Sequence, residues 1–427
     1  MKTLYLNNSK KHFKEAIRYI PLGSQTFSKS HVFFDPNYFP LFTKKGKNQY
    51  ISDIDNNKYL DLISALGAVS VGYGISKIDK KIIKELKNGI TFSLSHSKEL
   101  EITKLLIKLI PSAEMVRFGK NGTDVNSAAI RLARYVTRKD HIAVCGYHGW
   151  QDWFISSTSM SGGIPNGVKQ YTHTFIYNKI ESLKKLFKKK KLAAVIMEPL
   201  ASELPEKNFL KKVKMLCKKN KCLLIFDEVC TGFRVSMGGA QKLYNVKPDL
   251  STFGKAMANG YPLSALVGKE SIMKYADKIF YSGTFGGETL SLESCKQTIN
   301  FLIKNNSIKK NINKGLILKK ELHNLISKYN LSDYLELTGH PSWLFLKVKK
   351  LNIKKSMIIK TFIMHQLTLN KILFIGVFNI NHSHTVKDIL KIIKIMNKIL
   401  FRLSKQLDNL NSLTPAKIPR PLFQVRK

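Results

Sequence analysis

Two short segments of the sequence, each predicted to be a strand, are followed by side chains that could do chemistry. Residues 223–226 (LLIF) predict a buried strand of a parallel sheet and lead directly into Asp227 and Glu228. Residues 250–253 predict a second strand, after which Lys255 follows a glycine and precedes small residues. Because α/β sheets bind ligands at the carboxyl ends of their strands, this aspartate and this lysine are candidate site residues.

An aspartate and a lysine placed in this way meet two main needs of pyridoxal 5'-phosphate (PLP). The lysine would form a Schiff base with the cofactor aldehyde, and the acid would keep the pyridinium nitrogen protonated so that the ring accepts electrons. Two other interpretations stay open on the residues alone. A lysine at a strand end is usually solvated, and an Asp-Glu pair after four apolar residues also fits a nucleotide site that binds a metal.

A third segment adds a turn suited to a phosphate group. Residues 116–135 (VRFGKNGTDVNSAAIRLARY) predict a strand, a glycine-containing turn at 119–123 and a helix. The turn lies at a helix amino terminus, where free N–H groups and the positive end of the helix dipole favour an anion. Many α/β turns share this pattern, so the turn by itself is a weak indication.

The amino-acid sequences of the central segments resemble those of a known family. IFDEVCTGFR (225–234), followed by PDLSTFGKAMANGYPLSALVG (248–268), is similar to the class III aminotransferases of PLP fold type I. The likeness is strongest to glutamate-1-semialdehyde 2,1-aminomutase and related sugar-pathway aminotransferases, and it extends over roughly residues 15–400. The resemblance implies an α/β fold: a large domain with a mostly parallel central sheet flanked by helices, and a smaller α+β domain.

The same resemblance implies domain bounds and a set of site residues. Residues 1–70 would form an amino-terminal segment with a helix and a β-hairpin that packs with the small domain, 71–325 the large PLP-binding domain, and 326–427 the carboxyl-terminal small domain. The implied catalytic residues are Lys255, Asp227 and Tyr147. The implied cofactor-binding residues are Gly122 and Thr123 at the phosphate, Tyr147, His148 and Val229 around the ring, Asp227, Lys255, and Thr284.

Thr284 carries an implication about assembly. It lies in YSGTFGGETL (281–290), and related enzymes place this threonine on the phosphate of the neighbouring subunit's cofactor. We therefore expect a homodimer with shared active sites.

Two further residues have implied roles near the substrate. Lys29 stands where the aminomutase carries an arginine that pairs with the substrate carboxylate, and Glu198 would lie near the phenolic side of the cofactor.

The reaction has two candidate forms. The first moves an amino group from an amino donor to a separate keto or aldehyde acceptor. The second is the internal exchange that converts glutamate-1-semialdehyde into 5-aminolevulinate. Three departures from the aminomutase favour the first: Lys29 in place of arginine, Glu288 and Thr289 in place of Asn-Pro, and no glutamate between Lys371 and Lys387.

Composition excludes several other classes of protein. The chain of 427 residues carries 71 Lys and Arg against 29 Asp and Glu, a formal net charge of +42. The lysines are spread along the chain and concentrate in predicted helices, which indicates a compositional bias. A non-enzymatic, basic nucleic-acid-binding protein is a remote alternative. We expect neither nucleic acid nor membrane as a partner, because the sequence has no nucleic-acid motif and no apolar run of about 18 residues.

The cysteines and histidines point to a reducing environment without a metal. The five cysteines are odd in number and have no CxxC spacing, and the eleven histidines include no HExxH. The first residues lack the apolar core of a signal peptide. We expect a cytoplasmic enzyme with PLP and no metal.

Overall fold

A computed structural model describes residues 4–349, 352–413 and 417–418 of the chain. Contacts within the chain divide the described residues into two compact units. The large unit comprises residues 67–70 and 76–308, and the small unit comprises residues 4–66, 71–75 and those described between 309 and 418. The functional division of the chain at residues 70 and 325 stays a prediction.

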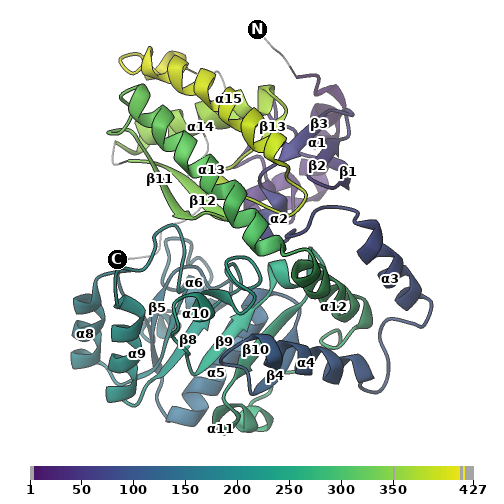
Figure 1. Ribbon diagram of the computed structural model, residues 1–427. Helices are drawn as coiled ribbons and strands as arrows, with labels where there is room; N and C mark the ends of the chain where they lie inside the picture. Colours follow the sequence, from purple (N-terminus) through teal and green to yellow (C-terminus); the bar gives the residue numbers. More distant parts are fainter. Residues whose placement is uncertain (1–3, 350–351, 414–416, 419–427) are drawn as a thin grey trace. The chain divides into compact units, whose positions relative to one another are not determined.

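The large unit is built on a seven-stranded sheet with the order β4-β10-β9-β8-β7-β5-β6 (Figure 1). Its strands are β4 (Met115–Gly119), β5 (His141–Cys145), β6 (Thr172–Thr174), β7 (Leu192–Met197), β8 (Leu223–Asp227), β9 (Leu250–Phe253) and β10 (Ser264–Gly268). All neighbours in the sheet pair in parallel except β10, which runs antiparallel to both β4 and β9. The mostly parallel sheet and the strands predicted at 223–226 and 250–253 are confirmed.

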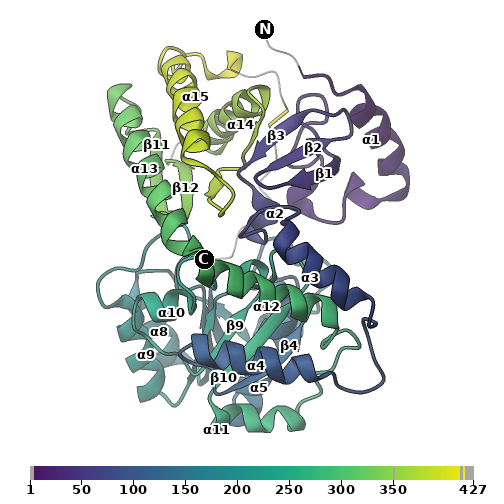
Figure 2. The ribbon, with the colours of Figure 1, turned by 45° about the vertical axis from the view of Figure 1, so that its right-hand side comes forward.

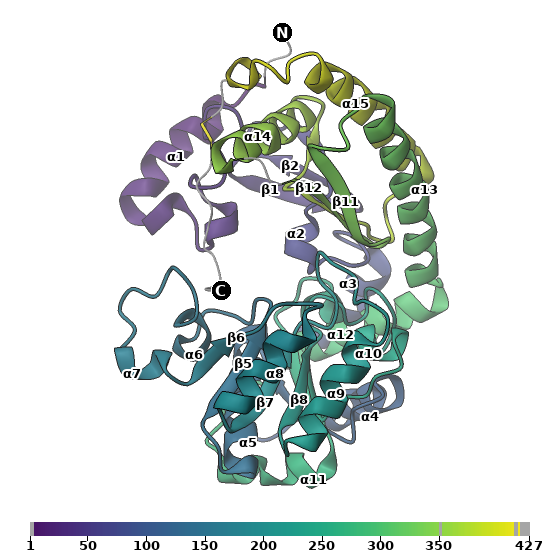
Figure 3. The same cartoon turned by 90° about the vertical axis from the view of Figure 1, so that its left-hand side faces the viewer.

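Apolar side chains cover both faces of the central strands. Leu224 and Phe226 of β8 belong to a core cluster with α8 (Ile180–Lys189) and α9 (Phe209–Lys219), whereas Ile225 belongs to the cluster with α5 (Gly122–Thr137). Figure 3 shows α8 and α9 together beside the sheet. Burial on two faces explains why β8 is a continuous apolar run rather than an alternating one. Asp227, two residues after Ile225, faces α5 in the same way.

The remaining helices of the large unit connect and flank the strands. α12 (Thr289–Lys304) packs against α3 (Ser76–Leu86) and α4 (Ser97–Leu109), as Figure 2 shows. The shorter elements are α6 (Asp152–Ile155), α7 (Asn166–Lys169), α10 (Gly239–Leu243), α11 (Glu270–Met273) and the 3-10 helices η3 (Lys255–Ala258) and η4 (Lys274–Lys278).

The small unit joins the two ends of the chain around a core of its own. A four-stranded sheet has the order β1-β2-β3-β13, and a three-stranded sheet has the order β11-β12-β14. The strands are β1 (Thr43–Lys47), β2 (Tyr50–Asp53), β3 (Lys58–Asp61), β11 (Leu335–His340), β12 (Trp343–Val348), β13 (Ile372–Leu373) and β14 (Val377–Asn379). The helices are α1 (Asn7–Tyr19), η1 (Pro21–Gly23), η2 (Phe27–Lys29), α2 (Ser64–Gly67), α13 (Ser307–Lys328), α14 (Ile353–Leu369), α15 (Val386–Ser404) and η5 (Leu410–Ser412). The predicted hairpin is confirmed as β2 and β3.

Three general properties follow from the described residues. No helix among them is both long and apolar enough to cross a lipid bilayer. Their histidine, cysteine, aspartate and glutamate side chains form no group of three or more that could hold a metal ion. All five cysteines are free thiols.

A buried lysine anchors the turn between β14 and α15 in the small unit. The Nζ atom of Lys314 on α13 donates to the carbonyl oxygens of Asn381 (2.9 Å), His382 (3.2 Å) and His384 (2.7 Å). Replacing Lys314 with methionine would leave these carbonyls without their donor, so we expect the free energy of unfolding to fall by about 2–3 kcal/mol. Denaturant unfolding measures this loss. Lys310→Met, at an exposed position of the same helix, is the control, and an equal effect of the two substitutions would contradict the prediction.

Candidate active site

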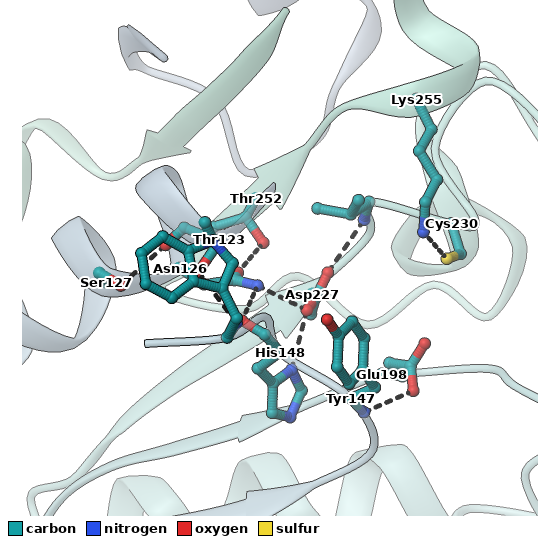
Figure 4. A network of polar contacts seen from close by, with 12 residues as sticks. Thr123, Asn126, Ser127, Tyr147, His148, Glu198, Asp227, Cys230, Thr252 and Lys255 are labelled. Atoms are coloured by element: carbon teal, nitrogen blue, oxygen red, sulfur yellow. Dashed lines mark hydrogen bonds and ion pairs between the residues drawn. The ribbon is translucent and has the colours of Figure 1, made fainter. Parts of the chain in front are cut away.

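The carboxyl ends of four neighbouring parallel strands bring predicted site residues together. In the sheet, β5, β7, β8 and β9 lie side by side. Tyr147 and His148 follow β5, Glu198 follows β7, Asp227 ends β8, and Lys255 follows β9. Figure 4 shows these side chains gathered around Asp227. The parallel topology therefore places an acid, a lysine and an aromatic ring at one edge of the sheet.

Asp227 is the most firmly held residue of the cluster. Its side chain is only 4% exposed. One carboxylate oxygen accepts hydrogen bonds from Asn126 Nδ2 (2.8 Å) and His148 Nδ1 (2.8 Å), and the other accepts from the backbone N–H of Val229 (3.1 Å). Asn126 is fixed in turn by Thr252 of β9, whose hydroxyl donates to its Oδ1 (2.6 Å). Three donors from three elements thus hold the carboxylate in one orientation.

The buried imidazole of His148 lies beside this carboxylate. Its Nδ1 faces Asp227, so we assign the hydrogen to Nδ1, which donates to the carboxylate. Its Nε2 is buried and has no hydrogen-bond partner among the described residues. In the assigned tautomer this atom is an acceptor, so no buried donor is left unpaired. The histidine supports the aspartate from the side of the β5 turn.

Lys255 occupies an uncommon backbone conformation at the start of η3. Its φ of 44° lies in the left-handed region, which for a residue with a side chain costs of order 1 kcal/mol or more. Its Nζ lies 2.6 Å from Sγ of Cys230. Burial lowers the pKa of the Lys255 amine, but Cys230, Asp227 and Glu198 together outweigh burial, so the pKa lies above its usual value. Strain of this kind is typical of functional residues.

Glu198 and the turn after β5 fit closely together. Its Oε2 accepts a hydrogen bond from the backbone N–H of Tyr147 at 3.0 Å. Gly146 has a φ of +109°, and a Cβ at this position would lie 2.5 Å from the same oxygen, so only glycine fits. Burial and the neighbouring Asp227 raise the pKa of Glu198 above its usual range. Tyr147 is 48% exposed, and its ring lies near the lysine and the two acids (Figure 4).

The predicted phosphate turn forms as a capped helix amino terminus. The carboxylate of Asp124, in the first turn of α5, accepts hydrogen bonds from the N–H groups of Lys120 (3.1 Å) and Asn121 (2.7 Å). Gly122 and Thr123 are the first two residues of the helix, where N–H groups lack intrahelical acceptors. The strand–turn–helix prediction for this segment is confirmed, and the turn keeps the anion-binding character of a helix amino terminus.

Close backbone packing joins this turn to the others. A Cβ on Gly122 would lie 3.0 Å from the Val229 methyl groups, and one on Gly149 would lie 2.4 Å from the Thr123 hydroxyl. The Thr123 hydroxyl also accepts a hydrogen bond from the N–H of Trp150 at 3.3 Å. The segments after β4, β5 and β8 therefore meet at positions where side chains are small.

Glu228, the second acid of the Asp-Glu pair, has a separate and structural role. Its fully buried carboxylate accepts hydrogen bonds from the N–H groups of Ala240 and Gln241, both at 2.7 Å, and from the Thr231 hydroxyl. These donors come from α10 and from the loop that precedes it. Burial raises the pKa of Glu228 to about 7 although the hydrogen bonds lower it.

This raised pKa predicts a pH dependence of stability. Between about pH 4.5 and 7 the folded chain holds a proton on Glu228 that the unfolded chain releases, so the contribution of this group to stability falls as the pH rises through this range. We expect Glu228→Gln, which cannot ionise, to gain stability relative to the wild type by about 1–3 kcal/mol between pH 5 and pH 8. Denaturant unfolding at several pH values measures the difference. The exposed Glu270→Gln is the control, and a pH-independent difference for Glu228→Gln would refute the prediction.

The cluster unites most of the residues predicted from the sequence. Its members are Gly122, Thr123, Tyr147, His148, Glu198, Asp227, Val229 and Lys255. Thr284 lies elsewhere: it is exposed and lines a cavity of about 930 Å³ with Gly119 and Lys120 of the phosphate turn. Lys29 is an exposed residue of η2 in the small unit. The roles of all these residues remain proposals.

The sequence did not point to three residues of the cluster. Asn126 and Thr252 fix Asp227, and Cys230 contacts Lys255. Asn126 had a usable signal, because it follows Thr123 by one helical turn on a face that is otherwise apolar. Cys230 and Thr252 had none, since neither a thiol after a strand nor a threonine within one indicates its partner.

The residues of the site fit PLP. A buried, hydrogen-bonded carboxylate suits a protonated pyridine nitrogen, and a lysine beside it suits an aldehyde. The turn at the start of α5 suits a phosphate, and glycines at Gly122, Gly146 and Gly149 leave room where a Cβ would collide. The half-exposed ring of Tyr147 and the side chain of Val229 are apolar surfaces suited to the two faces of a flat ring.

Comparisons with known proteins agree with this geometry. Residues 33–335 match the family model described as aminotransferase class-III. The chain is 37% identical over 357 residues to the 3-aminobutyryl-CoA aminotransferase of Cloacimonas acidaminovorans, covering 81% of this chain and 85% of that one. It is 40% identical over 306 residues to the glutamate-1-semialdehyde 2,1-aminomutase of Wigglesworthia glossinidia brevipalpis, covering 66% and 70%.

A solved structure extends the likeness to almost the whole chain. The FumI protein of Sphingopyxis sp. MTA144, in its PLP internal aldimine form, superposes with a TM-score of 0.87 at 25% identity, covering 96% of this chain and 99% of that one. The family match, the fold and the site chemistry agree, and the chain belongs to the class-III aminotransferases, which are PLP-dependent enzymes.

Proposed function

We propose that this enzyme transfers an amino group from an amino donor to a separate keto or aldehyde acceptor, and that Lys255 both holds PLP covalently and moves the proton during transfer. The observation that carries the proposal is the placement of Lys255, Asp227 and Glu198 at the carboxyl ends of the neighbouring strands β9, β8 and β7 (Figure 4). The five free cysteines support a reducing compartment, and we propose the cytoplasm.

Each residue of the cluster has a task that its geometry supports. PLP, when bound, supplies an electron sink for negative charge that develops on the substrate carbon. Asp227 would hold a proton at the pyridine nitrogen, because its buried carboxylate is kept in position by three donors. Gly122 and Thr123 would bind the phosphate with their N–H groups. Tyr147 and Val229 would orient the ring.

Lys255 would act as acid and base at the substrate carbon. The neighbouring acids and thiol keep a proton on its amine, and binding of a cofactor with its own charges would change that balance. A lysine that alternates between bonding the cofactor and moving a proton must reach both positions, and its flexible four-carbon side chain allows this.

The separate-acceptor reaction is favoured by one structural feature over the aminomutase reaction. Glu288, which stands where the aminomutase has asparagine, caps α12 by accepting from the N–H groups of Leu290 (2.9 Å) and Ser291 (3.1 Å). It also pairs with Lys120 of the phosphate turn at 2.8 Å. The relative that covers more of this chain is likewise named an aminotransferase. The aminomutase reaction is the second candidate because of the 40% identity to that enzyme.

Absorbance spectroscopy of the purified, PLP-loaded enzyme tests the two reactions. Each amino donor, including glutamate, alanine and 3-aminobutyryl-CoA, is added without an acceptor. Stoichiometric release of the matching keto product and loss of the PLP absorbance band would support transfer to a separate acceptor. Turnover of glutamate-1-semialdehyde to 5-aminolevulinate with no donor present would instead establish the aminomutase reaction.

We further propose a homodimer in which Thr284 serves the partner's site. The cavity that Thr284 lines is bordered by exposed apolar side chains, among them Phe92, Leu94, Phe280 and Phe285. An exposed apolar patch of this kind is typical of a protein interface. Thr284 is not part of the Lys255 cluster, and docking of a second copy of the chain on this apolar border would bring it to the partner's phosphate site.

Subunit mixing tests this arrangement. Lys255→Ala and Thr284→Ala each damage the sites of their own homodimers. In a mixed dimer, one site would combine an intact Lys255 with an intact Thr284 from the other subunit. We expect mixing to restore about a quarter of the wild-type activity, since half of the dimers would be mixed. No gain over the separate variants, or a monomer in sedimentation experiments, would refute the shared site.

A further inference from the structure

The thiol of Cys230 makes the closest polar contact of the Lys255 amine. Sγ of Cys230 and Nζ of Lys255 are 2.6 Å apart, and both side chains are partly buried. Cys230 lies three residues beyond Asp227, in the loop that follows β8, and Lys255 lies beyond β9. The contact therefore joins two neighbouring strand ends, as Figure 4 shows.

The other groups that face the lysine come from three strand ends. Asp227 ends β8, Glu198 follows β7, and the hydroxyl-bearing ring of Tyr147 follows β5. Neither acid is hydrogen-bonded to Nζ in the structure. Asp227 accepts hydrogen bonds from Asn126, His148 and Val229 instead. Glu198 accepts one from the Tyr147 N–H. Among the described residues, Cys230 is thus the side chain in hydrogen-bond contact with the amine.

We propose that Cys230 is a positioning residue for Lys255: the Cys230 thiol holds the free amine at the carboxyl end of β8. The proposal rests on the proposed role of Lys255 as the PLP-bonding residue. A free lysine side chain carries about 2 kcal/mol of rotamer entropy, and a fixed partner reduces the number of positions from which it must return to the cofactor.

The charges around the pair make the effect reciprocal. Cys230 raises the pKa of Lys255, and Lys255 lowers the pKa of the thiol against the burial that raises it. Removal of either partner must therefore shift the titration of the other in a known direction. A residue that only filled space would act through burial alone, and its removal would raise the pKa of the amine instead of lowering it.

Attachment of PLP to the apoenzyme tests the effect of the thiol on the lysine. An amine must be uncharged to bond an aldehyde, so the attachment rate rises with pH around the lysine pKa. Borohydride reduction and peptide mass give the fraction of Lys255 modified with time. We expect Cys230→Ala to move the midpoint of the pH profile downward by about one unit. Cys230→Ser, which keeps a hydrogen-bonding group but does not ionise in this range, should keep the attachment rate on the plateau near the wild-type value while showing the same downward shift.

Alkylation of the thiol tests the reverse effect without PLP or activity. Iodoacetamide is added to wild-type apoenzyme and to Lys255→Met apoenzyme over a range of pH, and the Cys230 peptide is measured against the Cys145 peptide of the same sample. Loss of the lysine charge should move the midpoint of Cys230 alkylation upward and slow it about fivefold or more at pH 8. Unchanged midpoints in both experiments would overturn the proposal. If PLP attached to another lysine of the wild-type enzyme, the proposed function would fail. The alkylation result would still show whether Cys230 and Lys255 interact.

Discussion

Lys255→Ala is expected to lower the rate of amino transfer by at least about 10³-fold, the range that loss of a positioned acid-base group produces. The variant would lack both the amine that bonds the PLP aldehyde and the base at the substrate carbon. Purified Lys255→Ala should still bind PLP at the phosphate turn, but borohydride should no longer fix PLP to the chain. Single-turnover kinetics with a saturating amino donor measure the loss.

Two further measurements separate chemistry from structure in this variant. Added methylamine should restore part of the rate, because a small amine can enter the space left by the side chain and move the proton in its place. Lys269 lies away from the cluster and forms an ion pair with Asp249 (2.5 Å). Lys269→Ala should therefore keep wild-type kinetics. Covalent PLP in Lys255→Ala, or activity within tenfold of the wild type, would show that another lysine does the chemistry.

Asp227→Asn is expected to lower the turnover rate by about 10²–10³-fold, comparable to the loss of one preorganised electrostatic contact in other enzymes. The amide is almost the same size as the carboxylate but carries no charge to hold a proton at the pyridine nitrogen. It also replaces one of the two carboxylate oxygens, which accept hydrogen bonds from Asn126, His148 and Val229, with an NH₂ group that cannot accept them. We therefore expect a stability loss of about 1–3 kcal/mol alongside the kinetic effect.

The neighbouring acid provides the matched control for this substitution. Glu228 follows Asp227 directly, is also buried, and binds N–H groups of α10 rather than the cluster. Glu228→Gln should change stability with pH as described above while turnover under saturating PLP stays close to the wild type. Equal kinetic losses in the two variants would mean that the Asp-Glu pair acts as one unit, against the separate roles that the hydrogen bonds indicate.

The local structure around the site was predictable because it depends on neighbours in the chain. An apolar run that stops at charged residues predicted β8, and the short segment 250–253 before a glycine predicted β9. The glycine-containing turn before an amphipathic segment predicted the start of α5. The side chains at the ends of those segments were therefore placed correctly at strand and helix termini. Resemblance to the class III aminotransferases added the chemistry that spacing alone left open between a PLP site and a nucleotide site.

Most contacts among the site residues were not predictable, since they are set by the order of the strands and by the packing of helices on the sheet. Asp227, Glu198, Tyr147 and Lys255 meet because β5, β7, β8 and β9 are neighbours, an order that no local pattern in the chain encodes. The packing of α5 on this sheet brings Asn126 to Asp227, and the adjacency of β8 and β9 brings Cys230 to Lys255.

The two acids at the end of β8 show most clearly what the sequence determined and what the tertiary structure decided. The sequence alone determined that a buried strand ends in Asp227 and Glu228, because an apolar run stops where charged residues begin. Only the tertiary structure decided their separate uses. Side chains alternate across a strand, so Asp227 faces α5 and meets Asn126 and His148, whereas Glu228 turns to the amino terminus of α10.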